Sequence, residues 1–435
     1  MPLRSATSAS QDGVAMQDGE SEGRSNERSR LRRGHLPYLL MLFVGIAGTA
    51  LVVAIVIVPA LWAMRVGSTI HFLEDRSMGV LKVFDPDWRR GWQTVGEARG
   101  EVPARGPDAE RWLVVSPEAA RDLSPLASLR PLDLQRIDLS DTPVTDAELR
   151  HITGFKSLLS LQLGDTNITD AGLAHLRRMR SLQQLHLSGT RITDAGLTHL
   201  RELSSLFDLR LARTDVTDAG LVRLERLTLL ERLDLGGTKV SDGGLQRLRR
   251  LTSLEELRLG DTRVTDAGLG HVRGLSRLEV PRTPITDAGL QHLKEAMQGL
   301  RCLDLEGTSI TDAGLGRLQG LRFLEVLLLS ETSVGDAGMA QLAKLPSLEG
   351  LGLGRTNVGD GGLAHLAGLP QLRRLDLTGT RVTDAGLVHL KKLAGLHRLY
   401  LRDTGVTDEG LEGLRDALPK CHIETTALPD AEDIF

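Results

Sequence analysis

One short pattern returns through most of this chain and limits the folds that the chain can adopt. The pattern is Thr-x-(Val/Ile)-(Thr/Ser/Gly)-Asp-x-x-(Leu/Met), and it occurs twelve times. Its leading threonines are Thr142, Thr166, Thr190, Thr214, Thr238, Thr262, Thr283, Thr308, Thr332, Thr356, Thr380 and Thr404. Nine of the eleven intervals between them are 24 residues long. A period in the twenties is typical of a small unit that is stable only when stacked on neighbouring copies, so the sequence predicts a repeat array.

Each unit combines two apolar periodicities. Leu185 and Leu187 alternate, as on a strand with one buried face, whereas the leucines of residues 197–203 recur every third residue, as on a short helix. The unit is therefore predicted to be a strand, a turn and a helix. Thr193 and Asp194 lie where the helix begins, so we expect a side-chain oxygen to cap free backbone N–H groups and the carboxylate to face the positive helix end.

One unit is shorter than the others. The interval from Thr262 to Thr283 is 21 residues, yet residues 275–283 keep the strand signature. The missing residues are therefore expected in the helix of that unit or at its exit.

The repeated Leu-x-x-Leu-x-Leu-x-x-Thr and Thr-Asp-Ala-Gly-Leu segments resemble the leucine-rich-repeat family, and the resemblance covers roughly residues 123–426. It implies an α/β solenoid, curved, with a parallel β-sheet on its concave face and helices on its convex face. Two subgroups are most similar: bacterial proteins with Thr-Asp-Ala-Gly-Leu repeats, often anchored in a membrane, and the repeat half of F-box ubiquitin-ligase adaptors. Most family members bind other proteins on the concave face.

Composition divides the rest of the chain. Residues 1–35 contain almost no bulky apolar side chains and are predicted to form a disordered cytoplasmic tail. Residues 36–64 carry no charge and are long enough for a transmembrane helix that acts as a signal anchor. Residues 65–122 are predicted to be a tether and an N-terminal cap, residues 123–426 the repeat domain of about 12 units, and residues 427–435 a C-terminal tail.

Two other interpretations of residues 36–64 are a cleaved signal peptide and a buried core helix. An apolar signal-peptide core is shorter, about 7 to 15 residues, and the segment ends without a clean small-x-small cleavage site. Nothing adjacent would cover the all-round apolar surface of a core helix. More arginines lie just before the segment than basic residues just after it, which predicts a cytoplasmic N-terminus and a periplasmic or extracellular repeat domain.

The charge and composition argue against several function classes. A net charge of −4 and 3% aromatic residues provide neither a basic patch nor a stacking surface for nucleic acid. An aspartate ladder (Asp146 and its eleven equivalents) and a histidine ladder that includes His175 were weighed as metal sites. Helix capping and partial exposure explain both ladders more simply, and no catalytic constellation stands out. We therefore predict no metal, no small-molecule cofactor and no enzymatic activity.

Strand alternation predicts which residues line the concave face. Over residues 208–279 the predicted outward positions alternate in charge sign along and across the strands, so this checkerboard is expected to neutralise itself. From Val326 onward the pattern changes to a neutral floor beside Tyr and Arg, a composition typical of an interaction hot spot. The predicted binding residues are Val326, Leu328, Ser330, Gly350, Gly352, Arg374, Asp376, Arg398, Tyr400 and Arg402.

These observations predict a membrane-anchored, non-catalytic binder of a protein partner whose identity the sequence does not give. One alternative is a substrate-recognition subunit of a ubiquitin-ligase complex, although residues 65–121 show no convincing F-box. A second alternative is a binder of a cell-envelope polymer. A signalling receptor is disfavoured, because only the predicted disordered tail of residues 1–35 would lie across the membrane.

Overall fold

The computed structural model describes residues 79–84, 93–94, 110–129 and 134–425, which all belong to one compact unit, Val66–Phe435. The predicted tail of residues 1–35, the predicted membrane helix of residues 36–64 and the C-terminal tail of residues 427–435 lie outside these ranges. Among the helices that the structure describes, none is long and apolar enough to cross a bilayer.

A single 16-stranded sheet runs through the described unit. Its parallel part begins at β3 (Glu110–Val115), ahead of the predicted array start at residue 123. On its other side, β3 pairs antiparallel with β1 (Gly79–Phe84), and β1 pairs antiparallel with β2 (Gln93–Thr94). The parallel strands after β3 are β4 (Arg136–Asp138), β5 (Ser160–Gln162), β6 (Gln184–His186), β7 (Asp208–Arg210), β8 (Arg232–Asp234), β9 (Glu256–Arg258), β10 (Arg277–Glu279), β11 (Cys302–Asp304), β12 (Val326–Leu328), β13 (Gly350–Gly352), β14 (Arg374–Asp376), β15 (Arg398–Tyr400) and β16 (His422–Glu424).

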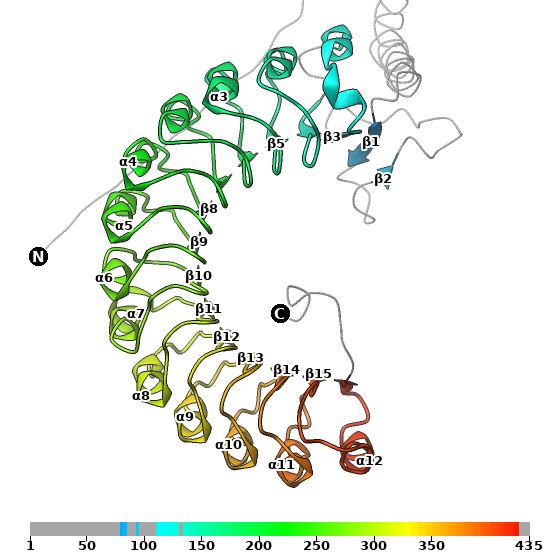
Figure 1. The fold of residues 1–435 in the computed structure, drawn as a ribbon, viewed down its shortest axis with the longest axis vertical. Helices are drawn as coiled ribbons and strands as arrows, with labels where there is room; N and C mark the ends of the chain where they lie inside the picture. The colour runs from blue at the N-terminus through cyan, green and yellow to red at the C-terminus, as the bar shows by residue number, and fades with distance from the viewer. Residues whose placement is uncertain (1–78, 85–92, 95–109, 130–133, 426–435) are drawn as a thin grey trace, which may run out of the picture. The chain divides into compact units, whose positions relative to one another are not determined.

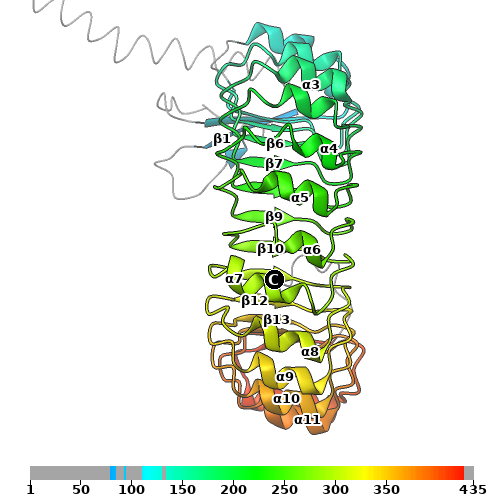
Figure 2. The same cartoon turned by 90° about the vertical axis from the view of Figure 1, so that its left-hand side faces the viewer.

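Helices follow most of these strands and line the opposite face. The α-helices are α3 (Asp170–Leu176), α4 (Asp218–Leu221), α5 (Asp242–Leu248), α6 (Asp266–Leu269), α7 (Leu290–Ala296), α8 (Asp312–Leu315), α9 (Asp336–Leu342), α10 (Asp360–Leu366), α11 (Asp384–Leu390) and α12 (Asp408–Ala417). The array of repeats is curved, with the strands on its inner side and the helices on its outer side (Figure 1). The helices follow one another along the convex face (Figure 2). The predicted parallel sheet with helices on its convex side is confirmed.

The predicted short helix of the unit is not an α-helix in two units. A 3-10 helix replaces it at η4 (Glu148–His151) and at η5 (Gly196–His199). In η5 the residue after the helix leucine is Thr198, and β-branched residues disfavour helix continuation.

The same position explains much of the variation in helix length. The helices that contain Ala174 or Gln246 there, α3 and α5, extend to 7 residues. The helices followed by Val222 or Gly270, α4 and α6, stop after 4 residues. Alanine and glutamine favour helix, whereas valine and glycine disfavour it, so the residue at this position influences whether a second turn forms. Val388 is an exception, because α11 has 7 residues.

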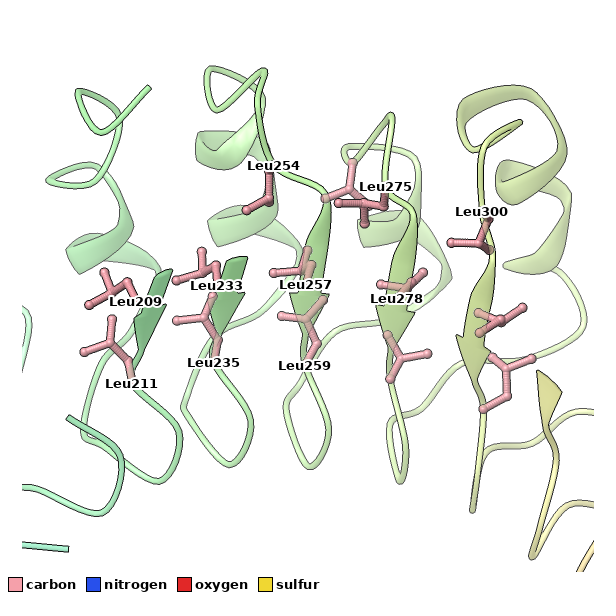
Figure 3. Packing of buried hydrophobic residues seen from close by; sticks show 14 of the residues in the cluster. Leu209, Leu211, Leu233, Leu235, Leu254, Leu257, Leu259, Leu275, Leu278 and Leu300 are labelled. Carbon is pink, nitrogen blue, oxygen red and sulfur yellow. The ribbon is translucent and has the colours of Figure 1, made fainter. Parts of the chain in front are cut away.

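Leucines from neighbouring units form one continuous core. Leu209 and Leu211, Leu233 and Leu235, and the equivalent pairs of later strands as far as β15 are at most 2% exposed. Figure 3 shows these pairs side by side between the strands and the helices. Each buried leucine contributes roughly 1.5–3 kcal/mol of burial free energy, so the stacked leucines are the main source of stability.

The predicted capping by the aspartate of the repeated motif is corrected by the structure, in which the preceding threonine caps the helix and the aspartate bonds the next unit. The capping residue of α3 is Thr169, whose hydroxyl accepts a hydrogen bond from the Ala171 amide, and the helix begins at Asp170 as predicted. The carboxylate of Asp146, one unit earlier, accepts bonds from the backbone amide (2.8 Å) and the hydroxyl (2.6 Å) of Thr169. The aspartates therefore form bridges from each unit to the next.

The same bridge recurs along the array. The residues that donate both bonds to the preceding aspartate are Thr169, Thr193, Thr217, Ser241, Thr265, Thr286, Thr311, Thr383 and Thr407. The bonds from Thr407 lower the pKa of Asp384, so this carboxylate is held in its ionised, accepting form. The threonine at the other end of the motif plays a local role: the hydroxyl of Thr142 donates to the carbonyl of Leu139 at 2.5 Å, as predicted for a turn hydroxyl.

Two units lack the hydroxyl half of this bridge. Gly335 and Gly359 donate only their backbone amides, to Asp312 and Asp336, each at 2.7 Å. The φ angles of these two glycines are −132° and −128°, which threonine adopts freely, and an added Cβ would meet no atom closer than 3.6 Å.

Replacing Gly335 and Gly359 with threonine is expected to stabilise the protein. Each new hydroxyl restores a bond to a carboxylate and a helix cap, for a gain of about 1–2 kcal/mol per site in the free energy of unfolding. Urea denaturation followed by circular dichroism measures this gain. Alanine at both positions is the matched control, because it removes glycine's backbone entropy without adding a hydroxyl. A threonine variant no more stable than the alanine variant would show that the missing bond carries no stability.

Candidate binding surface on the concave face

Each parallel strand presents alternate residues on the concave face, and neighbouring strands pair in register. Asp304 on β11 lies opposite Leu328 on β12, Leu328 opposite Gly352 on β13, and Gly352 opposite Asp376 on β14. Asp376 in turn lies opposite Tyr400 on β15. We call these five residues the central row. It crosses the second half of the arc in Figure 1, from β11 to β15.

Charges on the first half of the concave face pair with one another. Arg232 on β8 reaches Asp208 on β7, with 3.4 Å between the guanidinium nitrogen and the carboxylate oxygen. Arg258 on β9 and Arg277 on β10 both contact Glu279, at 3.2 and 3.1 Å. The predicted self-neutralising checkerboard is therefore present at these pairs, which are linked within and between strands.

At the outward positions of β12 and β13 the charges give way to a neutral patch, which consists of Val326, Leu328, Ser330, Gly350, Gly352 and Gly354. Ion pairs continue beside the patch, at Arg301–Glu325 and Arg355–Glu331. Val326, Leu328 and Ser330 are partly exposed and carry no charge, while the three glycines are buried small residues that add no side chain. A Cβ at Gly354 would lie 3.1 Å from an Asp376 oxygen and 3.3 Å from the Ser330 hydroxyl, so these two side chains leave little room for a larger residue at position 354. The structure thus brings together the first residues of the predicted site.

Three residues on β11 and its loop border the patch and were missed by the sequence interpretation. Cys302 lies opposite Val326, and Asp304 lies opposite Leu328. Glu306 follows two residues later and donates its amide to the Asp304 carboxylate at 2.9 Å. The outward alternation that identified Val326 and Leu328 applies equally to Cys302 and Asp304, so the same signal could have found them.

Asp304 occupies an unfavourable position for a carboxylate. Burial, together with the neighbouring Glu306 and Glu279 carboxylates, raises its pKa to about 6, although the Glu306 amide and Arg282 act in the opposite direction. Burial also raises the pKa of Glu306. At the β11 edge of the neutral patch, Glu306 pairs with Arg282 at 3.5 Å, whereas Asp304 has no ion pair among the described residues.

Replacing Asp304 with asparagine is expected to stabilise the protein in a pH-dependent way. Burial raises the pKa of Asp304 in the folded state to about 6, against about 4 in the unfolded chain. The contribution of Asp304 to the free energy of unfolding is therefore fully present below about pH 4 and is lost as the pH rises through about 6. Asparagine should therefore add roughly 2 kcal/mol to the free energy of unfolding at pH 8 and almost nothing near pH 4. Denaturation curves across this range measure the difference, and Asp416→Asn on the exposed face of α12 is the control. An equal gain at pH 4 and pH 8 would rule out the proposed cause.

The far side of the patch holds the remaining predicted residues. Arg374 and Arg402 are partly exposed and Arg398 is exposed, whereas Asp376 and Tyr400 are only 7% and 6% exposed. Asp376 accepts the Thr378 amide at 2.8 Å and forms no ion pair within the described part of the chain. Leu328 is therefore a cleaner target than Tyr400 for testing contact with a partner, because a charge at Tyr400 would be buried.

No metal site is visible in the parts of the chain that the structure describes, where no three His, Cys, Asp or Glu side chains gather closely enough to hold an ion. The ladder aspartates use their oxygens for the bridges between units. The expectations of no metal, no cofactor and no enzymatic activity stay predictions.

Comparisons with known proteins agree with this architecture. A family model described as Leucine Rich repeat matches residues 156–176, 178–200, 226–248 and 369–391. No curated protein matches the chain. The solved structure of an internalin from Listeria monocytogenes is 22% identical, with a TM-score of 0.52 over 70% of this chain and 89% of that chain.

Two further solved structures are similar at lower scores. A leucine-rich-repeat protein from Leptospira interrogans is 18% identical, with a TM-score of 0.44 over 72% of this chain and 88% of its own. A plant peptide hormone receptor, solved in complex with RGF2, is 13% identical, with a TM-score of 0.38 over 68% of this chain and 59% of its own. The likeness to the internalin, at 22% identity, shows the fold alone.

Proposed function

Because the chain belongs to the leucine-rich-repeat family, we propose that it is a non-catalytic protein that binds a protein partner on the concave face of β11 to β15. Proteins of this family are generally binding scaffolds. One observation carries the choice of surface: paired charges give way to a neutral patch edged by two carboxylates, Asp304 and Asp376, that have no ion-pair partner among the described residues.

The chemistry of the patch specifies the kind of partner. Val326 and Leu328 offer an apolar contact, and the glycines of the patch add no side chain that a partner would have to displace. Asp304 and Asp376 are three strand spacings apart in the central row, or roughly 14 Å at ~4.8 Å per strand. An extended segment rises ~3.3 Å per residue, so it would place two basic residues about four positions apart on these carboxylates, with an apolar residue between them.

Selection of random peptides on the purified protein tests this proposal. At pH 7.5 we expect enrichment of an apolar residue flanked by lysine or arginine, because only such a segment satisfies the patch and both carboxylates. Binding should weaken as pH falls through about 6, where Asp304 becomes protonated beside Glu306 and Glu279. Enrichment of acidic peptides, or binding that strengthens at pH 5, would contradict the proposed surface.

We further propose that residues 36–64 anchor the protein in a membrane and that the repeat domain faces the periplasm or the cell exterior. The proposal rests on the uncharged length of that segment and on the arginines that precede it. Protease treatment of intact cells, with and without a permeabilised outer envelope, measures the orientation. Repeats that stay protected after permeabilisation would overturn it.

A further inference from the structure

The shorter unit leaves a gap in the apolar packing. In the preceding unit, Leu248, Leu251 and Leu254 recur every third residue before the strand. The short unit has only Val272 and Leu275 in this stretch, so it has no counterpart of Leu251. Helix α6 ends at Leu269, just as α4 ends at Leu221 in a regular unit, so the missing residues fall beyond the helix end, between Val272 and Leu275.

The shortened segment after α6 is hydrogen-bonded to the following unit. The amide of Gly274 donates to the carbonyl of Ala296, at the end of α7, at 3.0 Å. Gly274 has a φ of +72°, the left-handed conformation that lets the shortened exit turn back sharply. The turn is therefore fastened to the unit ahead of it, and space remains between it and the unit behind it.

That space is a cavity of about 380 Å³ between the exits of α5 and α6. Its walls include Leu248, Leu251, Leu254, Val272 and Leu275. Leu251 and Leu254 are each 5% exposed, whereas their counterparts in the preceding unit, Leu227 and Leu230, are fully buried at 0%. Leu251 and Leu254 thus remain buried but are slightly more accessible than their counterparts in the preceding unit. Figure 3 labels Leu254 and Leu275 on the adjacent units that border the gap.

The rim of the cavity is basic. Arg249 and Arg273 are exposed residues that line it, together with Thr252 and the partly exposed His271. Within the described residues, neither arginine side chain makes a hydrogen bond or an ion pair. In contrast, the neighbouring Arg250, which does not line the cavity, contacts Glu225 at 3.4 Å. The guanidinium groups of Arg249 and Arg273 therefore lie at the rim of an aliphatic pocket and have no ion-pair partner among the described residues.

We propose that this pocket binds a short-chain aliphatic carboxylate, with its hydrocarbon chain against the leucines that line the pocket and its carboxylate at Arg249 and Arg273. A cavity of this size lies at the lower end of the range for small ligands, about 300–1,000 Å³, which suits a single chain better than a ring system. Arginine bonds carboxylates through paired, charge-assisted hydrogen bonds, so the acid is favoured over the matching alcohol or amine. The site is separate from the concave face and does not depend on the function proposed for that face.

Photolabelling of the full-length protein tests this site. The probe is octanoate with a diazirine at its apolar end, and the labelled peptides are mapped by mass spectrometry. We expect labels within residues 248–275, removed by excess octanoate but not by octylamine. Labelling spread over other segments, or equal competition by octylamine, would overturn the proposal.

Two variants separate the two halves of the site. Inserting Arg-Arg-Leu after Val272 restores the 24-residue period and the missing leucine, and should reduce labelling at least tenfold. The double variant Arg249→Gln, Arg273→Gln changes exposed side chains only and should reduce labelling roughly tenfold while leaving the fold intact. Arg177→Gln, at the position equivalent to Arg249 in a regular unit, should have no effect. Undiminished labelling of the double glutamine variant would overturn the proposal even if the insertion variant failed to fold.

Discussion

Replacing Gly220 with alanine is expected to lower the free energy of unfolding by roughly 2–4 kcal/mol, a large effect for the addition of one methyl group. A Cβ at Gly220 would lie 2.3 Å from the Asp194 carboxylate and 3.0 Å from a Leu197 methyl. Asp194 can move away only by giving up its bonds to the amide and hydroxyl of Thr217, at 2.8 and 2.6 Å. The glycine of the repeated motif is therefore required by the aspartate of the preceding unit.

A double-mutant cycle isolates this cause. Gly220→Ala should cost much less in an Asp194→Ala background, because both the clash and the bonds that it breaks are then absent. Gly154→Ala is the control, since a Cβ there would meet no atom within 4 Å. The stabilities are measured by urea denaturation, and hydrogen exchange should show the loss centred on the units around α4, because stability in a repeat array is set by contacts between neighbours. Additive losses in the two single variants would contradict the proposed bridge.

Replacing Leu328 with lysine is expected to abolish binding of the basic, apolar peptides selected on the protein, with a loss of roughly a hundredfold in affinity. The substitution would replace the apolar side chain that the partner contacts with an ammonium group. This group would lie beside Asp304 in the central row and would neutralise the carboxylate that the partner needs. Leu328 is partly exposed, so the fold should tolerate the change.

Calorimetric titration measures this loss, and Arg232→Ala is the matched control. Arg232 lies on the same face but pairs with Asp208, in the part of the array where charges already neutralise one another. Equal losses of affinity in the two variants would show that binding does not depend on the neutral patch.

Most of the scaffold could be predicted from the sequence because each unit carries its own signals. Alternating leucines such as Leu185 and Leu187 specify a strand, and Thr-Asp marks the helix start within the same unit. The bridge from Asp146 to Thr169 could not be predicted in this way, because a pattern within one unit says nothing about which atoms of the next unit lie within bonding distance. The aspartate was therefore interpreted as a cap for its own helix, when its carboxylate bonds the unit that follows.

The candidate site shows the same division. The change from charged to neutral residues at Val326 and Leu328 was visible in the sequence, because outward positions follow from strand alternation. The raised pKa of Asp304 depends on burial and on the nearby Glu279 and Glu306, which only the stacked strands bring together. The cavity beside Leu251 likewise follows from where the chain closes its deletion, a choice that the 21-residue interval alone leaves open.

The most direct measurement of the central claim is site-specific cross-linking of a bound partner. A photoreactive amino acid at position 328, in the neutral patch, should cross-link a selected basic peptide. The same group at position 210, on the self-paired part of the concave face, should not. Cross-links from position 210 with none from position 328 would place the binding surface elsewhere and contradict the account.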